Sequence, residues 1–235
     1  MLKIENLTKS YDKKTKALDS LTLSVNEGEI FGFIGHNGAG KTTAIKSITG
    51  VLPFDSGTVE LDGISLAKSP IAYKQKIAYI PDNPDLYENL TGIKYINFIC
   101  DIYGLDGEKR RLNIERFAEA FEITADLGSP ISSYSHGMKQ KVALIAALAH
   151  EPKLLILDEP FVGLDPKAAH SLKLFMRELC DNGGIIFFST HVLEVAEKLC
   201  DRIAIIKKGV VIKEGFTSEV VGDSSLEDIF LELVE

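Results

Sequence analysis

A glycine-rich segment carries the clearest chemical signal in the sequence. Residues 35–42 read GHNGAGKT and fit the pattern G-x-x-x-x-G-K-[ST], between an apolar run at 30–34 and a helical pattern. Glycines let the backbone N–H groups approach phosphate oxygens, Lys41 reaches the β- and γ-phosphates, and the Thr42 hydroxyl binds Mg²⁺. The alternative, a glycine-rich turn with an incidental lysine, does not account for the flanking strand and helix. The residues expected to contact nucleotide are Gly35, Asn37, Gly38, Ala39, Gly40, Lys41, Thr42 and Thr43, and Lys41 is also expected to act in catalysis.

Two adjacent carboxylates form the second signal. They end the segment KLLILDEP at 153–160, which reads as a buried strand. Where a strand leaves its sheet, both side chains can face one cleft. Asp158 suits the magnesium shell and Glu159 suits the polarisation of an attacking water. By itself the pair could be a solvated turn, but its occurrence together with the phosphate loop favours chemistry.

Three further motifs occur along the chain. YSHGMKQK at 134–141 precedes the acidic pair, and FVGLDP at 161–166 and STH at 189–191 come after it. Together with the two segments above, they resemble the nucleotide-binding domain of ATP-binding cassette transporters. The resemblance covers essentially the whole chain, and the YSHGM segment is the motif that separates this family from other phosphate-loop proteins. It implies an α/β fold, namely a P-loop NTPase core with an N-terminal antiparallel β arm and an inserted α-helical subdomain. It also implies ATP hydrolysis with ATP and Mg²⁺.

The YSHGM segment predicts a second anion site. Ser135 and Gly137 directly precede an apolar-periodic helix, whose N-terminus carries a partial positive charge. An ordinary N-capped helix is the structural alternative. In the family this segment reaches the γ-phosphate held by a partner domain, so the resemblance implies a second nucleotide-binding domain, identical or different. The family more often reads LSGGQ, and Met138 in place of the glutamine removes one polar contact.

The resemblance assigns three more positions. His191 matches the histidine that contacts the γ-phosphate and helps hold the attacking water, although a lone histidine after a strand is usually structural. Tyr11 matches the aromatic residue that stacks on adenine, with a surface aromatic as the alternative. Asp82 stands where the family usually has a glutamine at the metal. We expect its shorter carboxylate to reach Mg²⁺ through a bridging water.

The bulk composition excludes some classes of protein. The 235 residues are 45% hydrophobic, with 34 acidic and 26 basic residues, a formal charge of −8 and a pI near 5.2. That charge opposes binding to phosphate backbones, so nucleic acid is not expected as a partner. Three widely spaced cysteines, Cys100, Cys180 and Cys200, read as reduced thiols of a cytosolic protein. The helical settings of Cys100 and Cys200 favour buried hydrophobic roles.

No segment is long and apolar enough to span a bilayer. The longest apolar run, 142–149, falls far short of the roughly 18 residues required. The start, MLKIENLTKS, lacks the apolar stretch of a signal peptide. We therefore expect a cytoplasmic location. The family resemblance implies that the chain is peripheral on the inner face of the cell membrane, where membrane subunits would hold it.

Hydrophobic patterns place these motifs on one domain spanning 1–235. Continuous apolar runs at 30–34, 153–157, 184–189 and 203–206 predict a largely parallel sheet covered on both faces. Alternating runs at 2–7 and 18–25, separated by DKKTK, and a hairpin turning at Asp62-Gly63 predict the β arm. Helical spacing predicts an insert at about 88–150, with breaks at Gly104 and Gly107 and at 128–130. The arm and core then take about 1–87 and 151–222, and a capped C-terminal helix about 224–235.

The expected function is that of an ATP-binding and ATP-hydrolysing subunit, coupled to separate transmembrane permease subunits. The compact single cassette and the residues of the YSHGM and FVGLDP motifs resemble those of exporter subunits. The alternative is a soluble ATPase of this class that regulates a non-transport process, but the chain has neither two cassettes nor a long coiled coil. A non-hydrolysing binding module would be expected to lose Glu159 or His191, and both are present.

Overall fold

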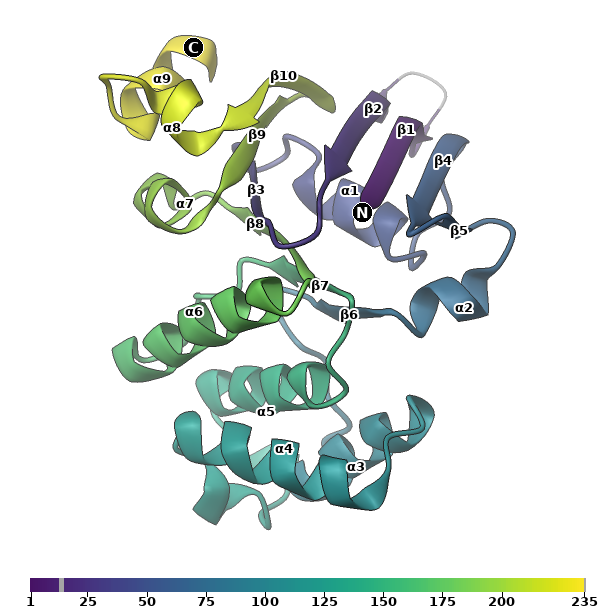
Figure 1. Cartoon of the computed structure of the whole chain (residues 1–235), viewed down its shortest axis with the longest axis vertical. Helices are drawn as coiled ribbons and strands as arrows, with labels where there is room; N and C mark the ends of the chain where they lie inside the picture. The colour runs from purple at the N-terminus through teal and green to yellow at the C-terminus, as the bar shows by residue number, and fades with distance from the viewer. Residues whose placement is uncertain (13–14, 235) are drawn as a thin grey trace.

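The computed structural model describes residues 1–12 and 15–234. Figure 1 shows two sheets in the upper part of the molecule and a group of helices at its lower end. One sheet has six strands in the order β10-β9-β3-β8-β7-β6, and the other has four in the order β2-β1-β4-β5. This is the mixed α/β architecture expected from the sequence.

The six-stranded sheet forms the core. Its strands β3 (Ile30–Ile34), β6 (Ile77–Ile80), β7 (Leu154–Asp158), β8 (Ile185–Thr190) and β9 (Arg202–Lys207) are parallel. Four of these strands lie within two residues of the apolar runs, because a strand covered on both faces shows no alternation. The strands β6 and β10 (Val210–Phe216) were not predicted, and β10 pairs antiparallel with β9 at the edge.

Helices cover both faces of this sheet. On one face α1 (Lys41–Ile48) packs into a core that it shares with the β arm. On the other face lie α6 (Pro166–Asp181) and α7 (Leu193–Leu199), in a second core that continues into the helical subdomain. The parallel arrangement brings the carboxyl ends of β3, β7 and β8 to one edge, where α1 begins.

The four-stranded sheet is the expected antiparallel arm. It consists of β1 (Leu2–Ser10), β2 (Lys16–Val25), β4 (Ser56–Leu61) and β5 (Ile64–Ser65). Asp62 and Gly63 make the hairpin turn with φ of 51° and 76°, a left-handed conformation that suits these residue types. Residues 13 and 14 of the charged DKKTK stretch lie outside the described residues.

The helical subdomain contains α3 (Gly92–Ile102), α4 (Gly107–Ala120) and α5 (His136–Ala149), with 3₁₀ turns at Thr124–Asp126 and Ile131–Ser133. All of these elements lie within the predicted interval. The helical pattern breaks between α3 and α4, where Gly104 and Gly107 predicted a break. Helix α4 begins at Gly107, and the Asp106 carboxylate caps it by accepting bonds from the N–H groups of Glu108 and Lys109.

The helix expected at about 224–235 is present as α9 (Leu226–Val234), and Glu235 lies outside the described residues. The short helix α8 (Thr217–Val221), which precedes it, was not predicted. Ser225 and Asp228 cap α9, with the Asp228 N–H donating to the Ser225 hydroxyl at 3.1 Å. The short helix α2 (Pro70–Lys74) was also not predicted.

The structure bears on membrane-spanning helices and on the state of the cysteines. Within residues 1–12 and 15–234, no helix is long and apolar enough to cross a membrane. The three cysteines are free and buried, and burial raises the pKa of each thiol. A raised thiol pKa suppresses the reactive thiolate, so these cysteines pack as small hydrophobic residues.

Candidate functional site

A cavity of about 400 Å³ opens at the carboxyl ends of β3 and β7. The phosphate loop, the start of α1 and the end of β7 surround it. Ligands of open α/β sheets bind at such an edge. The lining residues are Tyr11, Ala17, His36, Asn37, Gly38, Gly40, Lys41, Thr42, Thr43, Asp82, Asp158 and Glu159.

The phosphate loop favours glycine at two positions, at Gly40 through lack of space and a positive φ and at Gly38 through a positive φ alone. Gly40, at the N-cap of α1, has φ of 111°, and an added Cβ would lie 2.7 Å from the Ala17 carbonyl oxygen. Gly38 has φ of 81°, and a Cβ there would meet open space. Of the described residues, none caps α1 with its side chain, so its first N–H groups remain available to an anion. The loop therefore fits a phosphate chain.

Lys41 places a cation beside this loop. Its side chain is buried and its ammonium donates to the carbonyl oxygens of Gly35 at 2.6 Å and His36 at 3.3 Å. Burial lowers its pKa, and the Glu159 and Asp158 carboxylates oppose that change. Gly35 and Ala39, which were also expected at the nucleotide, lie behind the lining: Ala39 is buried in the core that the arm shares with α1. Both residues shape the loop from behind.

A hydroxyl and a carboxylate face each other at the acidic end of the cavity. The Thr42 hydroxyl donates to Asp158 Oδ2 at 3.0 Å, and the Ser189 hydroxyl donates to Asp158 Oδ1. Asp158 is buried. Oxygen ligands of this kind fit Mg²⁺, which takes one or two protein oxygens together with phosphate oxygens and water. Asp82 lines the same cavity from the loop that follows β6.

Glu159 and His191 form a second polar pair. Glu159 takes the left-handed conformation, with φ of 51°, while its N–H donates to the Ser189 carbonyl at 3.1 Å. This turn costs a non-glycine residue roughly 1–2 kcal/mol. The conformation directs the side chain to the cavity, where Glu159 Oε1 lies 2.8 Å from His191 Nδ1. A carboxylate held by an imidazole is equipped to orient and deprotonate water.

Tyr11 stands at the mouth of the cavity. Its ring is exposed, its hydroxyl lies 3.2 Å from the Thr43 hydroxyl, and the Lys9 ammonium sits 5.9 Å from the ring centroid. The ring is therefore accessible for stacking. Its contact with adenine stays a prediction.

Ser135 and Gly137 lie apart from this cavity, at the start of α5. The Ser135 hydroxyl accepts a bond from the Met138 N–H at 3.3 Å. A Cβ on Gly137 would come within 2.5 Å of the Gly163 carbonyl oxygen, and Lys141 pairs with Asp165 at 2.6 Å. These contacts join the start of α5 to the FVGLDP segment. Within one chain, then, the structure keeps the two predicted anion sites apart.

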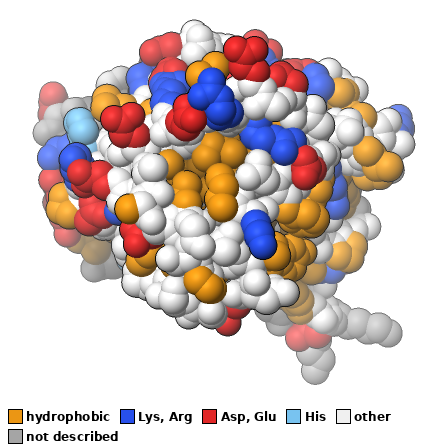
Figure 2. Space-filling view, turned by 90° about the horizontal axis from the view of Figure 1, so that it is seen from below, with side chains coloured by type: hydrophobic (Ala, Val, Ile, Leu, Met, Phe, Trp, Pro, Cys, Tyr) orange, Lys and Arg blue, Asp and Glu red, His pale blue; other side chains and the backbone are white. Residues whose placement is uncertain are grey.

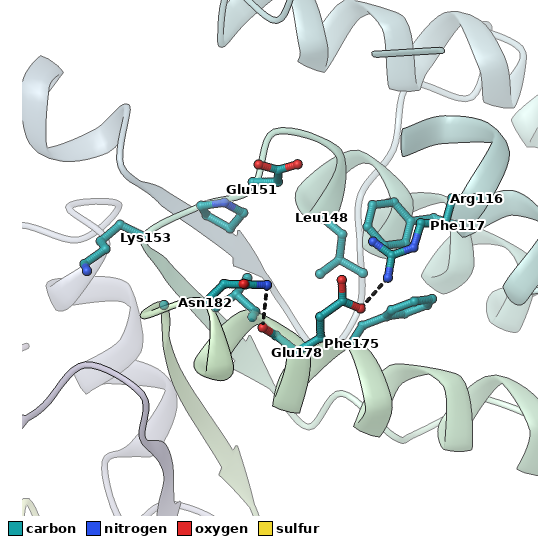
Figure 3. A pocket seen from close by; sticks show the side chains of 11 residues that line it. Arg116, Phe117, Leu148, Glu151, Lys153, Phe175, Glu178 and Asn182 are labelled. Carbon is teal, nitrogen blue, oxygen red and sulfur yellow. Dashed lines mark hydrogen bonds and ion pairs between the residues drawn. The ribbon is translucent and has the colours of Figure 1, made fainter. Parts of the chain in front are cut away.

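A larger cavity, of about 530 Å³, lies elsewhere (Figure 3). Lys153 and Gly184 lead into β7 and β8 there, so it faces the opposite edge of the sheet from the phosphate loop. Its charged groups are already paired: Arg116 bonds Glu178 across it, and Glu151 bonds Lys109. Neither the loop glycines nor the acidic pair line it. We therefore place the chemistry in the smaller cavity.

Sequence reasoning left three residues of the site without a role. Ser189 was noted within STH, but its bond to Asp158 depends on the parallel pairing of β7 with β8. Ala17 closes over Gly40 from the arm. His36 was noted inside the phosphate loop at a variable position, and the structure places it in the cavity wall. None of these placements has a local sequence signal.

Comparisons with known proteins agree with this geometry. A family model described as ABC transporter matches residues 18–162. The ABC-type transporter ATP-binding protein EcsA of Bacillus subtilis is 35% identical, over 100% of this chain and 97% of that protein. The linearmycin resistance ATP-binding protein LnrL of the same organism is 36% identical, over 97% of this chain and 74% of its own.

Solved structures match over nearly the full chain. The structure of an ATP-binding subunit of an ABC transporter superimposes with a TM-score of 0.95 at 36% identity, covering 99% of both chains. The dimeric post-hydrolysis state of the ATP-binding cassette MJ0796, bound to ADP and Pi, superimposes with a TM-score of 0.83 at 26% identity, covering 92% of this chain and 99% of that one.

Proposed function

The chain belongs to the ABC transporter family of ATP-hydrolysing proteins, and we propose that it drives transport through separate membrane-spanning permease subunits. One observation carries the proposal. A single cavity brings together the phosphate loop, Thr42, Asp158 and Glu159. His191 does not line this cavity but contacts Glu159 at 2.8 Å. Together these groups can bind a triphosphate, hold a metal and activate water.

The binding half of the mechanism rests on the loop and α1. Their N–H groups receive the β- and γ-phosphate oxygens, and Lys41 turns from the Gly35 carbonyl toward the same oxygens. Thr42 and Asp158 would hold Mg²⁺, with Asp82 acting through water, and the ion would offset the negative charge of the phosphates. Tyr11 stacks on the base at the mouth of the cavity.

The chemical half rests on Glu159 and His191. Glu159 accepts a proton from the water that attacks the γ-phosphorus, and the bond from the water oxygen to phosphorus forms as the bond to the β–γ bridging oxygen breaks. His191, 2.8 Å from Glu159, fixes the carboxylate and contacts the γ-phosphate. Most of the catalytic effect then comes from positioning and charge.

A second nucleotide-binding domain completes the site. Ser135 and Gly137 do not line the cavity of their own chain, and they lie at the N-terminus of α5. The dimeric MJ0796 structure is consistent with such pairing. We propose that two domains face each other, each contributing its α5 start to the nucleotide of the other.

The permease binds, in this proposal, at a groove between the core and the helical subdomain. A hollow of about 290 Å³ lies between β6, the loop that follows it, α3 and α5. Exposed Tyr87, Phe98 and Ile102 belong to the loop and α3. Figure 2, which views the helical end, shows hydrophobic side chains gathered near the centre of that face with charged ones around them. An amphipathic helix of a membrane subunit fits such a groove.

The loop that borders the groove also carries Asp82 into the nucleotide cavity, so one segment touches both sites. Coupling between two sites needs an element whose position both of them bias. We propose that this loop is that element. The direction of transport is proposed as export, and the resemblance to a linearmycin resistance protein supports it.

Lys41→Ala tests the nucleotide site. The variant should lose ATP binding and turnover while keeping its circular dichroism spectrum, since the ammonium ends at backbone carbonyls beside the cavity. Lys46→Ala, on the same helix but outside the cavity lining, is the control and should keep turnover. Unchanged ATP turnover in Lys41→Ala would remove the basis of the proposal.

Phe98→Arg tests the proposed permease surface, because Phe98 is exposed on α3, the helix that supplies Tyr95 and Ile99 to the groove. In membranes that contain the permease, this charge should abolish co-purification of the two subunits while leaving ATP binding by the isolated chain intact. Retained co-purification and transport would place the permease on another face and leave the nucleotide site untouched.

A further inference from the structure

The C-terminal helix α9 makes a direct contact with the phosphate loop. The Phe230 ring meets the His36 ring edge-on, with centroids 4.7 Å apart and planes at 66°. Such aromatic edge contacts contribute beyond simple burial of area. His36 lies in the wall of the nucleotide cavity, whereas Phe230 is buried in the core that extends into the helical subdomain. The pair therefore joins the loop to an element far along the chain.

His36 is a structural part of the loop and not merely a neighbour of it. Its carbonyl oxygen accepts a bond from the Ala39 N–H at 3.0 Å and another from the Lys41 ammonium at 3.3 Å. The orientation of this peptide group therefore influences where Lys41 stands before nucleotide arrives. The imidazole itself is exposed, so the position of the ring is set at the surface of the protein.

Helix α9 is attached to the core by two buried side chains and two hydrogen bonds. Leu226 and Phe230 are buried, and the Leu226 N–H donates to the Glu197 carboxylate of α7 at 2.8 Å. The Lys207 ammonium of β9 donates to the Leu233 carbonyl at 3.4 Å. Helix α7 follows the loop that carries His191. Thus α9 contacts α7, β9 and the phosphate loop.

We propose that Phe230 is a positioning residue for nucleotide binding: by holding His36, it keeps the phosphate loop and Lys41 in the geometry that receives the phosphates. The inference rests on the proposed nucleotide site. Phe230 acts through His36 and does not touch the nucleotide, and the chemistry of Glu159 and His191 is left as it is. Loss of the ring contact should accordingly weaken affinity for ATP and spare the chemical step.

Phe230→Leu in the full chain is the test, because leucine keeps apolar volume in the core but loses the aromatic edge contact. The Kd for MgATP and the KM should both rise about two- to tenfold, the scale of one aromatic pair. The kcat should stay within about twofold. Ile229→Ala is the matched control: it removes burial from the adjacent position of α9 and should leave KM unchanged.

A double-mutant cycle with His36→Ala separates positioning from general stability. If Phe230 acts through His36, the double variant should bind MgATP no more weakly than His36→Ala alone. Thermal unfolding without nucleotide shows whether the variants are folded. Unchanged affinity in Phe230→Leu, full additivity in the cycle, or an equal rise in KM for Ile229→Ala would each overturn the inference. Failure of the proposed function looks different, since Lys41→Ala would then keep ATP binding.

Discussion

Two helices, α1 and α5, begin at predicted anion sites but prepare them differently. Helix α1 starts at Gly40, where the described residues supply no side-chain cap, beside a buried lysine and a cavity of about 400 Å³. Helix α5 starts at Ser135, whose own hydroxyl already accepts the Met138 N–H, and Gly137 packs against the Gly163 carbonyl. The start of α1 has no side-chain cap among the described residues and lies in a cavity with groups that can bind phosphate. The start of α5 is capped by Ser135 and lies on the surface.

This difference shows how binding can be separated from catalysis. Because α1 has its ligand groups in place, a single chain is equipped to bind nucleotide. In the proposed dimer, the start of α5 would meet the phosphates bound by the other domain. Hydrolysis that needs both helices would then require the second domain, and closure of the proposed dimer would be a condition for turnover.

Glu159→Gln should give the largest effect and the sharpest separation. The amide keeps the shape of the side chain but cannot accept a proton, so turnover should fall by about 10²- to 10⁴-fold while ATP still binds. An ATP-bound dimer should accumulate, measurable by size-exclusion chromatography with MgATP. Glu194→Gln, an exposed acid on α7 paired with Lys198, is the control and should turn over ATP normally. Normal turnover in Glu159→Gln would show that the α1 side lacks the assigned base.

Ser135→Arg tests the α5 side. The arginine should block the approach of a second domain, so the pure variant should bind ATP with wild-type affinity but lose most turnover. Mixed with wild type, it should lower turnover per wild-type chain, because each shared site needs one α5 start. Ser135→Thr keeps the capping hydroxyl and should remain active. If Ser135→Arg hydrolyses ATP at the wild-type rate, one chain suffices and the comparison fails.

The contrast also shows which features could be read from the sequence. Strands β3 and β7 were predictable because burial on both faces leaves continuous apolar runs, and the phosphate loop because its glycines have one steric explanation. The short strand β6 was not, since IAYI before a proline also fits a loop. Its status depends on pairing with β7, a tertiary contact.

Within the site, local chemistry was readable but partners were not. Two adjacent acids at the end of an apolar run can be recognised in the sequence. The 2.8 Å contact between Glu159 and His191 depends on how two parallel strands end, which the sequence does not show. The contact of His36 with Phe230 had no signal in the sequence, because it joins a variable loop position to a helix at the other end of the chain. Motifs and their spacing therefore predict which residues belong to the site, but the contacts between those residues depend on tertiary packing.

The far end of α5 allows a smaller effect to be predicted. His150 follows this helix, its ring stacks on Tyr103 with centroids 3.6 Å apart, and burial lowers its pKa from 6.5 to about 4. The folded state therefore binds fewer protons than the unfolded state between these values, so stability is lost as pH falls from about 6.5 to about 4. Between pH 7 and pH 5 this residue should account for about 2 kcal/mol of lost unfolding free energy.

His150→Gln removes this titration and should flatten that part of the pH profile in urea unfolding. ATP turnover at pH 7 should change little, since the residue lines the groove and not the nucleotide cavity. Parallel profiles for wild type and variant would show that the imidazole is solvated in the native state.

Asp82 gives the smallest expected effect, and it tests how complete the α1 side is. The carboxylate lines the nucleotide cavity but its side chain is exposed, so its charge should count for roughly 1 kcal/mol. If it reaches Mg²⁺ through water, Asp82→Asn should weaken the apparent affinity for Mg²⁺ by about two- to fivefold, because one negative charge beside a divalent cation is lost. Asp82→Gln should stay active with an altered magnesium optimum, because its longer stem restores direct reach without the charge.

Turnover across a magnesium titration for wild type, Asp82→Asn and Asp82→Gln decides whether Asp82 contacts the metal or only lies near it. Superimposable curves would assign the metal to Thr42 and Asp158 without Asp82, and the loop would then link groove and cavity through its backbone alone.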